Sequence, residues 1–249
     1  MFYEKDLGST RFFAFSELDE IPGLLHAFTT RVTDTLVKDA GRSGEVAREK
    51  ALFLSTLGIS PTQVVQLKQV HSDRVLAIDG TGVSGSLRSL QSADAVYFAH
   101  PGLFAIIKTA DCAPLIAVYP KGRAVCAVHA GWRGTRDRIT KKALEQFLRA
   151  NQAAPDDLIV AIGPCIGQCC YEVGVEVIEQ FQNARHDLNR IVAGRNLDIV
   201  EANRIQLQEL GIERILCSGM CTACRTDLFY SYRREGQTGR LWALVGFTA

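Results

Sequence analysis

Two chemically reactive side chains, Cys112 and His129, lie on either side of a predicted β-hairpin. Apolar segments flank the turn at Pro120–Gly122, and a turn centred between Pro120 and Lys121 places Cys112 opposite His129. Directly opposed Cβ atoms lie about 4.5–5.5 Å apart, and a register shift of one or two residues leaves the pair neighbours. A thiolate and an imidazole at that spacing can share one Zn²⁺ ion, because Zn–S and Zn–N bonds measure about 2.3 and 2.0–2.1 Å.

His71 supplies the third predicted ligand, because it follows a strand-like segment and precedes a Ser-Asp turn. The other histidines lie in less suitable contexts: His26, His100 and His186. Three protein ligands with one open position are typical of catalytic zinc, which lowers the pKa of a bound water to about 7. Asp111, beside Cys112, either orients a ligand or accepts a proton; the alternative is a turn residue that caps its own backbone.

The segment Gly131–Thr135 follows the second predicted strand of the hairpin and leads into a predicted helix. Its glycines allow the backbone to approach a ligand closely. N–H groups at the start of the helix, together with Arg133, favour an anion such as phosphate. The alternative interpretation is a tight strand-to-helix turn in which Thr135 is the N-cap.

The elements that must position these residues are mostly short strands. Apolar runs bounded by turn residues predict strands at Val64–Leu67, Arg74–Ile78, Ala95–Phe98, Phe104–Lys108, Leu115–Tyr119, Ala124–Val128, Leu158–Ile162 and Leu241–Val245. Helical periodicity predicts helices at Glu45–Leu57, Arg136–Ala150, Val175–Phe181 and Glu201–Leu210. Strands that often follow one another directly indicate an α+β fold, and no linker divides residues 1–249, so we predict a single domain.

The composition excludes some classes of protein. The 28 basic and 27 acidic residues give a net charge of +1, which favours neither nucleic acid nor an anionic membrane surface as a partner. No segment approaches the roughly 18–20 apolar residues of a membrane span, and the first residues do not resemble a secretory signal. We therefore predict a cytoplasmic protein.

Eight cysteines are more than packing requires. Cys126 and Cys217 lie in apolar runs and are predicted to be small buried residues. Cys221 and Cys224 have the spacing of a zinc or redox pair, but a structural zinc site would need further ligands from Cys165, Cys169 or Cys170. The adjacent pair Cys169–Cys170 is interpreted as incidental, and no such site is expected.

The chain resembles the YfiH family, also called the laccase-domain or polyphenol oxidase family. The stretches that carry the resemblance cover nearly the whole chain in order: HAFTTR (26–31), QVHSDRV (69–75), SADAVYF (92–98), KTADCAPLI (108–116), AVHAGWRGT (127–135), AIGPCIGQCCYEVG (161–174) and DLFYSYRREGQTGR (227–240).

The resemblance implies β-sheets in a sandwich flanked by helices, with zinc held by His71, Cys112 and His129. It also implies action on purine nucleosides: phosphorolysis of adenosine, inosine and 5′-methylthioadenosine, and deamination of adenosine. The expected partners are therefore a purine nucleoside and phosphate, with Cys112, His129 and Asp111 as catalytic residues.

Arg31, Lys50 and Arg133 are the residues predicted to bind the substrate. Members of the family commonly carry Asn-Arg in the helix after HAFTTR, and this chain aligns Glu49-Lys50 there. Lys50 keeps the positive charge but lacks the planar fork with which arginine binds phosphate.

Other functions use the same residues. A copper-dependent polyphenol oxidase is one, because two histidines and a cysteine also form blue-copper sites. Such a site often has an axial methionine, and the chain contains only Met1 and Met220; few histidines remain for further copper centres. A metal-free Cys-His amidase that edits a peptidoglycan precursor is another. A binding module without activity would not need this cluster, and the sequence predicts no oligomeric state.

Overall fold

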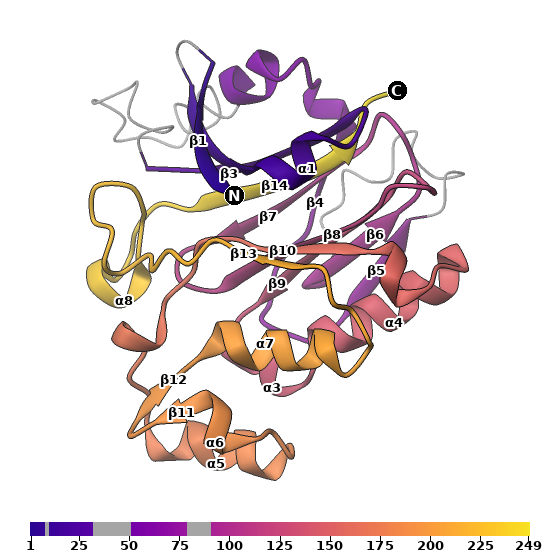
Figure 1. The fold of residues 1–249 in the computed structure, drawn as a ribbon. Coiled ribbons are helices and arrows are strands. Elements are labelled where there is room, and N and C mark those ends of the chain that lie inside the picture. The colour runs from indigo at the N-terminus through magenta and orange to yellow at the C-terminus, as the bar shows by residue number, and fades with distance from the viewer. Residues whose placement is uncertain (8–9, 32–50, 79–90) are drawn as a thin grey trace.

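Two β-sheets packed face to face form the centre of the molecule in a computed structural model, which describes residues 1–7, 10–31, 51–78 and 91–249 (Figure 1). The predicted fold class, sheets in a sandwich flanked by helices, is confirmed. The first sheet has the order β1-β2-β3-β14-β7-β4. Its strands are β1 Phe2–Asp6, β2 Arg11–Phe15, β3 Leu24–Thr29, β14 Leu241–Phe247, β7 Phe104–Thr109 and β4 Val64–Gln66.

The second sheet has the order β13-β10-β8-β9-β6-β5. Its strands are β13 Ile215–Cys217, β10 Ile159–Ile162, β8 Ala113–Tyr119, β9 Ala124–Ala130, β6 Ala95–Phe98 and β5 Val75–Ile78. Its central pairs are antiparallel, whereas β13 runs parallel to β10 and β5 runs parallel to β6. The chain therefore leaves β10 and β13 at the same edge of the sheet.

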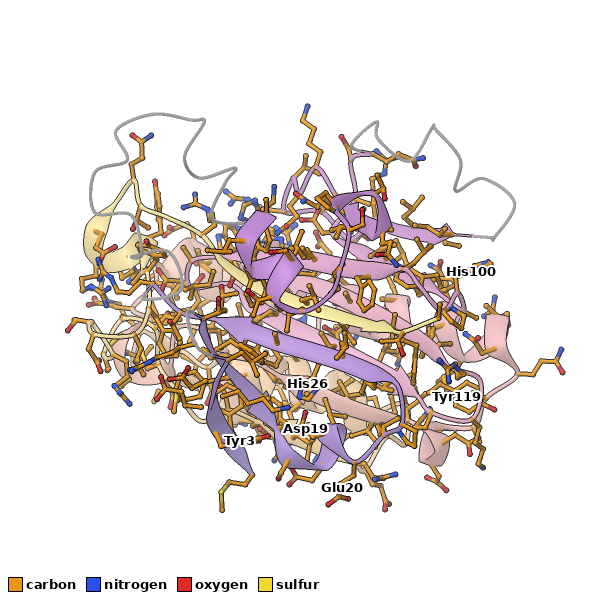
Figure 2. The ribbon with its side chains drawn as sticks, turned by 90° about the horizontal axis from the view of Figure 1, so that it is seen from above. Tyr3, Asp19, Glu20, His26, His100 and Tyr119 are labelled. Carbon is orange, nitrogen blue, oxygen red and sulfur yellow. The ribbon has the colours of Figure 1, made fainter. Side chains whose placement is uncertain are left out.

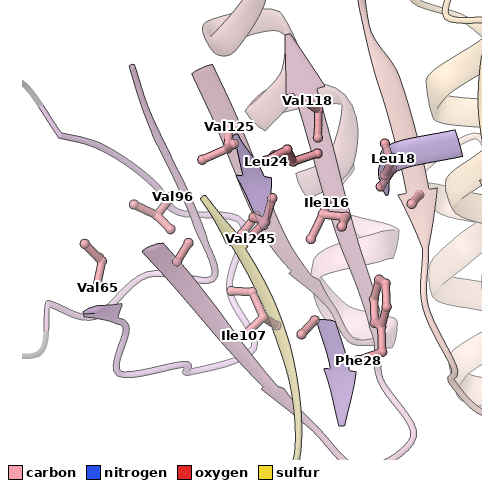
Figure 3. Close-up of a cluster of buried hydrophobic side chains, with 14 of the residues drawn as sticks. Leu18, Leu24, Phe28, Val65, Val96, Ile107, Ile116, Val118, Val125 and Val245 are labelled. Carbon is pink, nitrogen blue, oxygen red and sulfur yellow. The ribbon is translucent and has the colours of Figure 1, made fainter. Parts of the chain in front are cut away.

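The main core lies between the two sheets, where every second residue of a strand points inward (Figure 3). Ile107 and Val245 of the first sheet face Val96, Ile116 and Val125 of the second, and all five are buried. Burial of a side chain of this size contributes about 1.5–3 kcal/mol. This core holds the two sheets in a fixed relation, and so it fixes the strands that carry the candidate site.

Helices cover the outer face of the second sheet (Figure 1). These are α3 Trp132–Arg136, α4 Ile139–Asn151 and α7 Ile199–Gln208. Residues 51–56 are helical and place Phe53 and Leu54 on the outer face of the first sheet. The remaining short elements are α1 Ser16–Asp19, α5 Val175–Asn183, α6 Leu188–Ile191, α8 Tyr232–Glu235, η1 Pro61–Gln63, η3 Pro155–Asp157, η4 Gln168–Cys170, β11 Val192–Ala193 and β12 Asn196–Leu197. No helix in the described ranges is both long and apolar enough to cross a membrane.

The helix predicted at Arg136–Ala150 is wrong at its start, because the chain breaks between α3 and α4. Arg138 adopts a left-handed backbone conformation (φ 64°), which ends the short helix and redirects the chain. The side chains of Ala143, Leu144 and Phe147 then pack on the outer face of the second sheet. The break separates the turn beside the site from the helix that covers the sheet.

The predicted register of the hairpin is wrong by two residues. Tyr119 pairs with Ala124, so four residues rather than two form the loop, and Pro114 lies opposite His129. Arg123 closes the loop with a φ of 46°, and its N–H donates to the carbonyl of Pro120. Cys112 consequently precedes the first residue of β8 and lies at the open mouth of the hairpin.

His26 is a buried residue of β3, and Figure 2 shows it beside Asp19. Its Nε2 accepts a hydrogen bond of 2.9 Å from the N–H of Phe15, so the proton of the neutral ring lies on Nδ1. Burial lowers the pKa of His26 to about 4, although the Asp19 carboxylate, 3.8 Å from Nδ1, opposes the shift. His26 is therefore neutral in the folded protein at pH 7.

Candidate active site

The structure brings together the three residues predicted as metal ligands. One ligand atom from each of His71, Cys112 and His129 lies within 4.8 Å of the others. The two imidazole rings meet edge to face, with 4.9 Å between their centroids. His71 comes from the turn before β5, Cys112 from the turn between β7 and β8, and His129 from β9.

The turn that carries His71 depends on Asp94, which sequence reasoning did not select. His71 has a φ of 59°, a conformation that costs energy for a residue other than glycine. The buried carboxylate of Asp94 accepts hydrogen bonds from the N–H groups of Val70 (3.3 Å), His71 (3.0 Å) and Ser72 (2.7 Å) and from the Ser72 hydroxyl (2.7 Å). Asp94 therefore holds the strained turn in place.

Asp94 also orients His129. The Nδ1–H of His129 donates to Oδ1 of Asp94 at 2.8 Å, which leaves Nε2 as the atom available to a metal. Burial alone would raise the pKa of Asp94, but hydrogen bonds from His129 and Ser72 lower it to about 2. Carboxylates in this position fix the tautomer and orientation of metal-binding histidines. In the sequence, Asp94 could have been noticed as an aspartate directly before β6. This strand pairs with β9, which carries His129.

Cys112 and His129 shift each other's pKa. Burial alone would raise the pKa of the Cys112 thiol, but His129 and His71 lower it to about 6. Burial would lower the pKa of His129, but Cys112 and Asp94 raise it to about 9. The cluster therefore favours a thiolate with a cation beside it, which is the state that a divalent metal requires of a cysteine ligand.

Gly131 provides the space in which these ligands converge. A Cβ atom at this position would lie 3.0 Å from both Sγ of Cys112 and Cδ2 of His71. Any larger residue would push one ligand away from the other. Two imidazoles and one thiolate, arranged in this way, fit a zinc ion with a fourth position left open.

Asp111 lines the cavity beside Cys112 and is hydrogen-bonded to distant segments of the chain. Its buried carboxylate accepts hydrogen bonds from the Thr222 hydroxyl (2.6 Å), the Ser231 hydroxyl (3.1 Å) and the Arg233 N–H (2.7 Å). These donors come from distant segments, and none is His71 or His129. Asp111 thus ties the C-terminal segment to the turn that carries Cys112.

The three ligands open into a cavity of about 670 Å³. Five basic side chains line it, namely Lys68, Lys108, Arg133, Arg233 and Arg240, together with the aromatic side chains of Trp132, Tyr171 and Tyr232. Burial and the nearby charge of Arg240 lower the pKa of Lys108. A cavity of this size and charge suits a small molecule with an anionic group.

The predicted substrate-binding residues have different positions. Arg133 lines the cavity, with its guanidinium 4.2 Å from the Trp132 ring centroid. Arg31 does not line the cavity; it donates to the Glu235 carboxylate at 2.9 Å and to the carbonyl of Thr226. Lys50 lies outside the described residues.

The interpretation of Thr135 as a helix N-cap is wrong, because Gly131 is the N-cap of α3. Thr135 instead lies inside this five-residue helix and is fully buried. The prediction for Cys217 is also wrong. This residue is exposed at the end of the edge strand β13, whereas Cys126 is buried as predicted.

The fold and the site define a sandwich of two mixed sheets with a His-Cys-His cluster that could hold a metal beside a cationic cavity. The chain belongs to the family described as multi-copper polyphenol oxidoreductase laccase, whose model matches residues 33–248. The resemblance to YfiH proteins is confirmed: the structure of YfiH from Bacillus licheniformis has a TM-score of 0.85 and 26% identity, and the match covers 98% of this chain and 99% of that one.

Relatives in this family carry the names of enzymes. The chain is 37% identical over 235 residues to a purine nucleoside phosphorylase of Deinococcus radiodurans, covering 89% of this chain and 88% of the relative. It is 35% identical over 192 residues to adenosine deaminase RL5 of an unknown prokaryotic organism, covering 72% and 73%.

Proposed function

We propose that the protein is a zinc-dependent purine nucleoside enzyme that cleaves adenosine, inosine and 5′-methylthioadenosine with phosphate and deaminates adenosine. One observation carries the proposal: His71, Cys112 and His129 open into a cavity that offers aromatic rings for a base and cations for phosphate. The names of the two relatives support both activities.

The cavity suits both substrates of a phosphorolysis. Its volume of about 670 Å³ is in the range of small-molecule sites. Tyr171 and Trp132 offer flat faces to a purine. Lys108, Arg133 and Arg240 line the cavity and would supply positive charge to a phosphate dianion, since guanidinium groups bind phosphate oxygens in pairs.

In phosphorolysis, a phosphate oxygen forms a bond to C1′ of the ribose while the bond from C1′ to N9 of the purine breaks. The purine leaves with the electron pair of that bond and takes up a proton. The cavity's cations would orient the phosphate and offset its charge as it approaches the sugar. The products are the free base and ribose 1-phosphate, or 5-methylthioribose 1-phosphate when 5′-methylthioadenosine is the substrate.

In deamination, water adds to C6 of adenosine and ammonia leaves, so that inosine forms. When bound, zinc supplies a Lewis acid and activates water. The chain's own residues hold the site: Asp94 fixes the tautomer of His129, and Gly131 lets Cys112 approach His71. The ring nitrogen Nε2 of His129 would thereby be available to hold the ion.

Copper is the second candidate, because two histidines and one cysteine also bind blue copper and the family description names copper oxidases. Met220, the one methionine away from the N-terminus, packs against the core between the sheets instead of lining the cavity. Of the five histidines, only His71 and His129 line the cavity. These two histidines are too few for a multicopper centre rich in histidine, which supports zinc.

Metal analysis combined with product analysis tests the proposal. Purified protein is assayed for zinc and copper, then incubated with adenosine in the presence and absence of phosphate. We expect bound zinc, adenine that appears only with phosphate, and inosine in both cases. Cys112→Ala should abolish both products, while Cys217→Ser, which changes an exposed cysteine outside the cavity, should abolish neither.

Other outcomes would overturn the proposal. Phenol oxidation by a copper-loaded protein, without nucleoside turnover, would favour the oxidase. Activity that survives complete removal of metal but is lost in Cys112→Ala would favour a Cys-His hydrolase. The zinc assignment fails if metal-free protein retains full nucleoside turnover.

A further inference from the structure

Four cysteines that lie far apart in the sequence meet at one edge of the second sheet. Cys169 and Cys170 belong to η4, which follows β10, and Cys221 and Cys224 lie in a turn that follows β13. Because β10 and β13 are parallel neighbours, the chain leaves both at the same edge of the sheet. An isolated backbone β-bridge between Cys165 and Cys221 continues their pairing. The four Sγ atoms all lie within 4.8 Å of one another.

Three sulfur–sulfur distances in the cluster are close to those around one tetrahedral ion. They are 3.7 Å for Cys169–Cys170, 3.6 Å for Cys169–Cys224 and 3.4 Å for Cys170–Cys224. Four sulfurs bound at about 2.3 Å in a tetrahedron lie about 3.8 Å apart. A disulfide would require about 2.05 Å, and the structure holds all four residues as free thiols.

Apolar packing does not account for this cluster, because only Cys170 and Cys221 pack against the core. Cys169 and Cys224 are exposed, whereas Cys126 and Cys165 are buried in the core. The backbone N–H of Gly167 donates to Sγ of Cys221 at 3.2 Å, an interaction typical of thiolate sulfur that binds a metal. A Cβ atom at Gly167 would lie 3.3 Å from Sγ of Cys169, so a glycine leaves room for the sulfurs to converge.

We propose that Cys169, Cys170, Cys221 and Cys224 form a second metal site, which binds one structural Zn²⁺ ion through four thiolates. Soft thiolate ligands select zinc or iron over hard cations. Four protein ligands leave no open position, which is typical of a structural site and distinguishes this one from the three-ligand cluster at Cys112. The ion would take the place of four thiol protons, which are released on binding.

The second site lies directly behind one wall of the cavity. Thr222, inside the Cys221–Cys224 turn, is fully buried and donates to the carboxylate of Asp111. Tyr171, which follows Cys170, lines the cavity. An ion that binds these two segments together would therefore hold Asp111 and Tyr171 in place without touching the substrate.

Zinc stoichiometry tests this proposal without an activity assay. Protein prepared under reducing conditions should bind two zinc ions per chain, and His71→Ala/His129→Ala should retain one. Cys169→Ser/Cys224→Ser should also retain one, while the matched control Cys217→Ser should retain two, because that exposed cysteine lies outside the cluster.

The ligands of the remaining ion identify its site. X-ray absorption of zinc-loaded His71→Ala/His129→Ala should show four sulfurs at about 2.3 Å and no nitrogen. Co²⁺ in the same variant should give the strong sulfur-to-cobalt charge-transfer absorption of a tetrathiolate. Neither measurement requires the cysteine variants to fold.

Three results would overturn the proposal. One is a wild-type protein that binds a single zinc ion, all of which is lost in His71→Ala/His129→Ala. Another is iron in place of zinc in the cluster. The third is mass-spectrometric detection of disulfides among the four cysteines in protein whose free thiols were blocked at lysis.

Discussion

Replacement of Asp94 by asparagine should weaken zinc binding at the cluster of His71, Cys112 and His129 by about 10–100-fold, or about 1.4–2.7 kcal/mol. Oδ1 of Asp94 accepts from Nδ1–H of His129 and from the N–H of His71, and Oδ2 accepts from Ser72 and Val70. An asparagine places an NH₂ group in one of these two positions. Whichever orientation it takes, two N–H donors lose their acceptor.

The cost should also appear in the stability of the metal-free protein. Each buried donor without a partner costs about 1–3 kcal/mol. Because the carboxylate holds the turn of His71 at a φ of 59°, the loss should fall on ligand geometry and on folding together. Zinc affinity is measured by competition with a chromophoric chelator, and stability by urea denaturation of the metal-free protein.

Ser72→Ala provides the matched control. It removes one hydrogen bond to Oδ2 of Asp94 but leaves the contact between Asp94 and His129 intact. Its zinc affinity should stay within about threefold of the wild type, because this hydrogen bond to a carboxylate contributes about 1.5–3 kcal/mol to folding but does not involve the ring of His129. The reasoning is refuted if Asp94→Asn binds zinc as tightly as the wild type, or if Ser72→Ala weakens zinc binding equally.

Three further predictions concern other parts of the molecule. His26 is protonated near pH 6.5 in the unfolded chain and only near pH 4 in the folded chain, so acidification from pH 6.5 to pH 4 should lower the free energy of unfolding by up to about 3 kcal/mol. Urea denaturation at these two pH values should show a smaller loss for His26→Gln than for the wild type. Lys108→Met should raise KM for phosphate by about tenfold or more while adenosine deamination, assayed in parallel, changes little, and an equal loss of both activities would contradict a phosphate role. Phe181→Ala should destabilise the protein by about 3–5 kcal/mol in the same urea assay, because the ring is fully buried among Val177, Ile191 and Leu197; a loss below about 1 kcal/mol would show that this cluster contributes little.

Local sequence pattern was sufficient to predict the central strands. β6 has the predicted bounds, and β7, β8, β9, β10 and β14 lie within a few residues of them, because each is a short apolar run bounded by turn residues. The strands β1, β2 and β3 were not predicted. The residues of β1, Phe2–Asp6, are partly buried or exposed, and the segment contains no apolar run that would predict a strand. Its pairing with β2 holds it in the sheet.

The hairpin prediction brought Cys112 near His129 even though its register was wrong. The prediction assumed a two-residue turn, and the chain forms a four-residue loop closed by the left-handed Arg123. An even shift of two residues keeps each side chain on the same face of the sheet, because the side-chain period of a strand is two.

Residues that hold the ligands in place could not be predicted in the same way, because their partners come from segments that are distant in the sequence. Asp94 acts through the pairing of β6 with β9, and Asp111 acts through donors more than 100 residues away. The four-cysteine cluster likewise depends on the parallel pairing of β10 with β13, which no local periodicity reports. The ligands can be recognised from residue type and spacing, whereas the residues that hold them in place can be identified only when the strand order is known. In this protein one strand order determines both, since the sheet that carries His129 also brings Thr222 to Asp111 beside Cys112.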